Sequence, residues 1–73
     1  MALLDLPAPM AGAIKELLVA VGERVDAGQE LVIIESMKME IPIESPAGGT
    51  IAEFAVQPPQ NVEEGQLLLR LEV

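Results

Sequence analysis

The residues around Lys38 limit the chemistry that this lysine can perform. The run Glu35–Glu40 reads ESMKME, which places Lys38 between two methionines and two glutamates in a chain whose other lysine is Lys15. A deprotonated lysine amine is a nucleophile that accepts an acyl group. Glu35 and Glu40 should favour the charged ammonium, so another protein would have to supply the acyl group and remove the proton. From the residues alone, an ordinary exposed turn lysine is the favoured interpretation.

The composition excludes most other chemistry. The chain has 73 residues with no cysteine and no histidine, which removes thiolate nucleophiles, thiolate zinc sites and the usual general base near neutral pH. We therefore expect no catalytic residue, no metal site and no independent enzyme activity. The net charge of −8 disfavours nucleic acid and anionic lipid as partners. No apolar run reaches the roughly 18 residues of a membrane span, and the N-terminus lacks signal-peptide features, so we expect a cytoplasmic protein without membrane insertion.

The chain repeats itself at a fixed spacing. A shift of 37 residues lays residues 2–36 on residues 39–73 without a gap. The shift superimposes turn glycines, prolines and apolar residues: Pro9 on Pro46, Gly12 on Gly49, Ile14 on Ile51, Val25 on Val62, Gly28 on Gly65, Gln29 on Gln66 and Leu31 on Leu68. We interpret this register as an internal duplication within one domain that spans residues 1–73.

The repeat decides between helix and strand for the segment Ile14–Val21. Its apolar residues recur at helical spacing, but the second copy places Pro58 and Pro59 at and after the position of Val21, where a helix would be interrupted. Both copies are therefore expected to be extended. Their shared apolar residues are spaced by three and then by two, which predicts a β-bulge near Lys15–Glu16 and near Ala52–Glu53.

Two equivalent halves of about four short strands predict an all-β domain, with two small antiparallel sheets related by a pseudo-twofold axis. Met37 and Lys38 lie between the halves. They should form the tip of a hairpin between the strands Leu31–Glu35 and Glu40–Ile43. A twofold arrangement places this tip at the end of the domain opposite Met1 and Val73.

At these residues the sequence resembles the biotinyl domain of the biotin carboxyl carrier (biotin/lipoyl attachment) family. Glu35–Met39, ESMKM, matches the family's attachment motif E-[AS]-M-K-M. PAPMAG at Pro7–Gly12 and VGERVDAGQ at Val21–Gln29 resemble its opening strand and first half-repeat loop. The resemblance implies a flattened β-barrel (a barrel-sandwich hybrid) of two four-stranded antiparallel sheets. It also implies covalent biotin on Lys38, with Glu35, Ser36, Met37 and Met39 as the surrounding motif.

The resemblance further implies a carrier function. A biotin protein ligase would attach biotin, a biotin carboxylase would carboxylate it, and a carboxyltransferase would pass the carboxyl group to an acyl-CoA or oxo acid. The alternative is a lipoyl carrier of a 2-oxo acid dehydrogenase-type complex, whose lysine typically has an Asp-Lys-Ala context. Met37 and Met39 favour biotin over lipoate, although some short family members resemble both classes. An unmodified interaction module is the third possibility.

Two family features bear on the subtype. The ungapped repeat leaves no room for the protruding loop that many bacterial acetyl-CoA carboxylase carriers have in the first half. Pro58–Pro59 stands where the family more often has a glycine-containing loop, and we expect it to alter a turn only. The sequence is compatible with a free subunit and with a domain of a longer chain.

Overall fold

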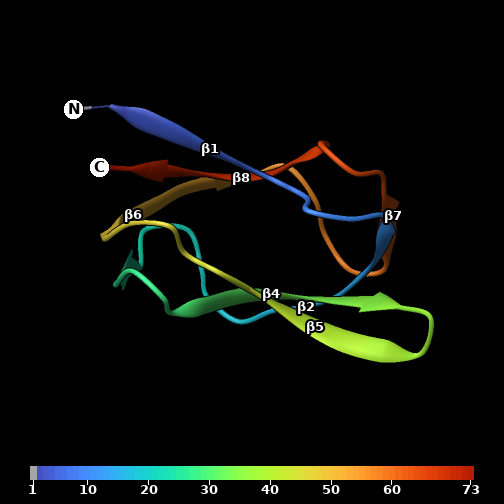
Figure 1. Ribbon diagram of the computed structural model, residues 1–73. Coiled ribbons are helices and arrows are strands. Elements are labelled where there is room, and N and C mark those ends of the chain that lie inside the picture. Colours follow the sequence, from blue (N-terminus) through green and yellow to red (C-terminus); the bar gives the residue numbers. More distant parts are fainter. Residues whose placement is uncertain (1) are drawn as a thin grey trace.

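The computed structural model describes residues 2–73, which form two four-stranded sheets (Figure 1). The eight strands are β1 (Leu3–Pro7), β2 (Gly12–Leu17), β3 (Arg24–Val25), β4 (Glu30–Ser36), β5 (Met39–Glu44), β6 (Gly49–Phe54), β7 (Gln60–Val62) and β8 (Leu67–Glu72). Every strand pair is antiparallel. The predicted all-β fold with two four-stranded antiparallel sheets is confirmed. Within residues 2–73, no helix is long and apolar enough to cross a membrane.

The two sheets have equivalent strand orders. One sheet runs β1-β8-β6-β3 and the other runs β5-β4-β2-β7. The 37-residue shift places each strand of the first sheet on the strand at the same position in the second, with β1 on β5, β8 on β4, β6 on β2 and β3 on β7. This correspondence supports the proposed duplication of half-repeats 2–36 and 39–73.

Aliphatic side chains from both sheets make the core. The residues that are fully shielded from solvent include three pairs at equivalent positions of strands β4 and β8: Leu31 and Leu68, Val32 and Leu69, Ile34 and Leu71. Each such side chain stabilises the fold by about 1.5–3 kcal/mol through removal of apolar surface from water. Arg70 stands at the position of Ile33, and both are less buried than their neighbours, so this position faces outward in each half.

A β-bulge lies at the predicted place in each half. The β2–β4 register shifts between Ile14 and Glu16, and the β6–β8 register shifts between Ile51 and Glu53. Lys15 and its counterpart Ala52 are therefore the extra residues. The bulge explains why a run with helical spacing is extended here: it lets the residues on both sides of it face the core.

Two equivalent loops tie the halves together. Gly28 and Gly65 both have φ of +86°, a left-handed conformation that favours glycine, and nothing lies within 4 Å of where a Cβ would be. The Gly28 N–H donates to the Ser45 carbonyl, and the Gly65 N–H donates to the Ala8 carbonyl, each at 2.8 Å. These bonds join each loop to the opposite half of the chain.

Candidate functional site

The β4–β5 hairpin ends in a two-residue turn formed by Met37 and Lys38. Ser36 pairs with Met39 immediately below the turn, and Glu35 pairs with Glu40 one step further in. Both turn residues have positive φ, 52° for Met37 and 65° for Lys38. Positive φ at both central residues is the property of a type I′ turn, whose twist matches that of the flanking strands. The strand register thus fixes the backbone from which Lys38 projects.

Met37 and Lys38 are residue types that do not favour the left-handed conformation of this turn. Type I′ turns favour Asn-Gly, whereas an L-residue with a Cβ loses roughly 1–2 kcal/mol in the left-handed region. Burial does not offset this loss, since Met37 is 92% exposed and Met39 is 64% exposed. Lys38 is exposed as well. Strained backbone with exposed apolar side chains is a pattern found at functional sites.

The hairpin tip lies at one end of an elongated molecule. The long dimension is 36 Å, against 18 and 17 Å for the others. Figure 1 shows the tip of the β4–β5 hairpin at the end opposite the start of β1 and the end of β8. Ala2 and Val73 exchange backbone hydrogen bonds of 3.2 and 2.9 Å, and under the 37-residue shift they correspond to Met39 and Ser36. The predicted placement of Met1 lies outside the described residues.

The two glutamates of ESMKME contact Lys15 rather than Lys38. The Lys15 ammonium donates a hydrogen bond to Glu40 Oε2 and lies 3.9 Å from Glu35 Oε2. The hydrogen bond and the charge of Glu40 raise the pKa of Lys15 above its ordinary value of 10.5, and Glu35 adds to the effect. Among the ion pairs of residues 2–73, none involves Lys38. The sequence predicted that Glu35 and Glu40 act on Lys38, whereas in the structure both carboxylates pair with Lys15.

The reason for this difference is the bulge. It places Lys15 as an extra exposed residue on β2, which is two strands away from β5 in the sheet order β5-β4-β2-β7. From there its side chain reaches over β4 to the Glu35–Glu40 pair. Sequence reasoning named the bulge and the glutamates separately but did not bring Lys15 and Glu40 together as partners.

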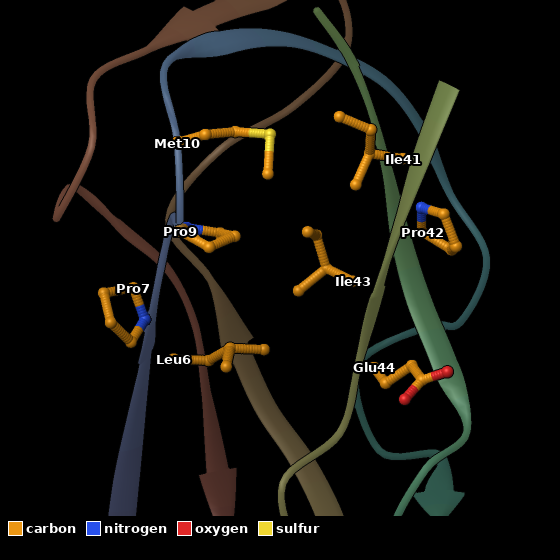
Figure 2. Close-up of a pocket in the computed structure, with 8 residues that line it drawn as sticks. All are labelled: Leu6, Pro7, Pro9, Met10, Ile41, Pro42, Ile43 and Glu44. Carbon is orange, nitrogen blue, oxygen red and sulfur yellow. The ribbon is translucent and has the colours of Figure 1, made fainter. Parts of the chain in front are cut away.

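A groove of about 340 Å³ lies between the end of β1 and strand β5. Figure 2 shows Leu6, Pro9 and Met10 pointing across it toward Ile41 and Ile43, while the Glu44 carboxylate points away. The side chains facing one another across the groove are apolar, and the one charged residue of its lining is Glu44. Within residues 2–73, no cluster of potential metal ligands occurs either.

A second, shallow hollow of about 450 Å³ lies beside the hairpin tip. Met37, Ser36 and Glu35 line one part of it, and Asn61 and Glu63 belong to the lining contributed by β7 and the residue after it. The hollow brings the second half of the chain close to the motif. Glu63 is therefore a further carboxylate in the surroundings of the tip.

The predicted motif residues gather at this one end of the sheet. Met37, Lys38 and Met39 form the exposed tip, while Ser36 is half-buried and Glu35 is exposed and held by Lys15. The other lysine, Lys15, is engaged by two carboxylates, so within residues 2–73 Lys38 is the lysine whose amine takes part in no ion pair.

Curated relatives match most of the chain. It is 42% identical over 62 residues to the biotin/lipoyl attachment protein of Bacillus subtilis, covering 85% of each chain. It is 41% identical to the biotin carboxyl carrier protein of Streptococcus mutans, covering 90% of this chain and 51% of that one. Methylcrotonoyl-CoA carboxylase subunit alpha of Arabidopsis thaliana is 39% identical over 88% of this chain, which spans 9% of that protein. Several relatives are thus far longer than this chain.

Solved structures show the same fold. The urea carboxylase of Kluyveromyces lactis matches with a TM-score of 0.92 and 26% identity, covering 99% of this chain and 6% of that one. The lipoyl domain of the 2-oxoglutarate dehydrogenase complex from Azotobacter vinelandii matches with a TM-score of 0.81 and 28% identity, covering 94% and 95% of the two chains. The family model described as "Biotin-requiring enzyme" matches residues 4–71. The chain belongs to this biotin/lipoyl attachment family.

Proposed function

We propose that this chain is a biotin carboxyl carrier and that Lys38 is the residue to which biotin is attached. The observation that supports this most directly is the position of Lys38, at the exposed tip of a register-fixed hairpin within the ESMKM motif of a family member. The relatives include proteins named as biotin carboxyl carriers and as carboxylases, which favours biotin over the lipoyl alternative. A carrier role also agrees with a chain that lacks histidine and cysteine.

The attachment step needs little from the chain itself. The neutral Lys38 amine attacks the carbonyl carbon of an activated biotinyl group, the new C–N bond forms, the activating group leaves, and the amine loses a proton to a base of the modifying enzyme. That enzyme, a biotin protein ligase, is part of the proposal. The chain contributes an amine on a hairpin of defined strand register and, through Met37 and Met39, an exposed polarizable surface for docking.

Once attached, biotin supplies a ring urea that accepts a carboxyl group and gives it up, and the protein supplies placement. The Lys38 arm projects from one end of the 36 Å long axis, so the body of the domain does not surround it. A tethered group reaches effective concentrations of up to roughly millimolar at its partners. We infer that the partners are a biotin carboxylase and a carboxyltransferase. The expected cytoplasmic location stays a prediction.

The experiment is a modification assay read by intact mass. The unmodified chain is incubated with ATP, biotin and a biotin protein ligase, and in parallel with lipoate and a lipoate ligase. We expect one biotinyl group per chain, its complete loss in Lys38→Arg, and normal labelling in the matched control Lys15→Arg. Lipoyl transfer without biotinyl transfer would establish the alternative function. Absence of both modifications in a folded chain would overturn the carrier proposal.

A further inference from the structure

The equivalent β-bulges of β2 and β6 differ in one residue. Lys15 occupies the bulge of β2, while Ala52 occupies the equivalent bulge of β6. The fold therefore does not require a lysine at this position. Lys15 lies where two glutamates face each other: its ammonium contacts Glu35 of its own half and Glu40 of the other half, whereas the equivalents of these two residues are Glu72 and Leu3. The lysine thus accompanies the glutamate pair that lies next to the Lys38 turn.

The contacts of Lys15 span the three strands that support the hairpin. Lys15 lies on β2, Glu35 on β4 and Glu40 on β5, and the two glutamates face each other as a cross-strand pair. Like charges directly opposite on a sheet repel each other. The lysine offsets this repulsion, and it occupies both carboxylates of the second residue pair below the turn that contains Lys38.

We propose that Lys15 is a positioning residue for the modification of Lys38: by pairing with Glu35 and Glu40, it keeps both carboxylates from binding the Lys38 ammonium. The inference rests on the proposed attachment of biotin to Lys38. It assigns the second lysine of the chain a role in the reactivity of the first. Lys38 lies on the same hairpin as Glu35 and Glu40, two residues before Glu40, so we infer that it pairs with them when Lys15 is absent.

The electrostatic effect has a definite sign. Removing the Lys15 charge leaves a doubly negative pair beside the tip, with Glu16 on β2 and Glu63 beside the adjoining hollow adding to the negative field. A carboxylate released from Lys15 can pair with the Lys38 ammonium instead. An exposed ion pair of ordinary strength lowers the acylation rate of Lys38 about twofold to threefold.

The test measures acylation of Lys38 without any ligase. Wild type, Lys15→Ala and Lys15→Gln are labelled with acetic anhydride at neutral pH and low salt, and the Lys38 peptide is quantified by mass spectrometry. Ala52 shows that alanine fits this bulge, and glutamine keeps most of the side-chain stem. We expect the Lys38 rate to fall about twofold to threefold in both variants. The difference should disappear at about 1 M salt, where the Debye length is roughly 3 Å.

Two controls separate charge from structure. Lys15→Arg should keep the wild-type rate, and adding Glu40→Gln to Lys15→Ala should restore most of it. Arg70→Gln removes an ion-pair cluster of the other sheet, with Asp5 and Glu53, and should leave the Lys38 rate unchanged. Equal Lys38 rates in wild type and Lys15→Ala, or a loss that persists at high salt, would overturn the proposal. Because no ligase is used, that result would leave the carrier function untouched.

Discussion

The strained turn at the hairpin tip predicts that replacing Met37 with glycine stabilises the protein. Met37 has φ of 52° and is 92% exposed, so its side chain contributes almost no packing. A left-handed L-residue costs roughly 1–2 kcal/mol, while glycine loses about 0.5–1 kcal/mol more backbone entropy on folding than other residues. The net gain for Met37→Gly is about 0.5–1 kcal/mol. For a domain of this size, the midpoint of thermal unfolding should rise by about 2–8 °C.

Thermal and urea unfolding followed by far-UV circular dichroism suit this measurement, because the chain has one phenylalanine and neither tryptophan nor tyrosine. Met39→Gly is the matched control. Met39 is also exposed and lies two residues away in the regular strand β5, without positive φ. Glycine there should lower the free energy of unfolding by about 0.5–1 kcal/mol. If Met37→Gly lowers stability as Met39→Gly does, the turn is not strained and the reasoning fails.

Two further predictions concern packing and pH. In Gly12→Ala the new Cβ would lie 2.6 Å from Ile34 Cγ2 and 2.8 Å from the Glu35 carbonyl oxygen, so urea unfolding should show a loss of about 1–3 kcal/mol. Gly48→Ala, with its nearest atom at 3.7 Å, should stay within about 0.5 kcal/mol of wild type, and equal effects would contradict the close approach. The raised pKa of Lys15 means that its ion pairs stabilise the fold fully below about pH 10.5 and less as pH rises through the folded-state pKa. Between pH 9.5 and about 12 the thermal midpoint should therefore fall more in wild type than in Lys15→Met, and parallel curves would count against the ion pairs.

Much of the architecture could be predicted because the two halves of the chain share one sequence pattern. The bulge in each half was predicted from an apolar spacing that both halves share. The hairpin location of Lys38 followed from the junction between the repeats. These inferences concern backbone register, which the alternation of buried and exposed residues determines strongly.

Side-chain partners could not be predicted in the same way. Lys15 and Glu40 are 25 residues apart and meet only because the bulge exposes Lys15 on the face that the glutamates share. Their contact depends on three strands at once, whereas sequence reasoning placed Glu35 and Glu40 beside Lys38 from proximity along the chain. The left-handed conformation of the turn also could not be predicted, because methionine and lysine are not typical of a type I′ turn, whereas Asn-Gly is.

The paired ends of the chain suggest how this protein could be made into a ring. Ala2 and Val73 are hydrogen-bonded as an antiparallel pair, in the register that Met39 and Ser36 have below the Lys38 turn. A two-residue Met-Lys link from Val73 back to Ala2 would close a second hairpin that copies the first. The resulting cyclic protein would have no free ends and would display a lysine at each pole of its 36 Å axis.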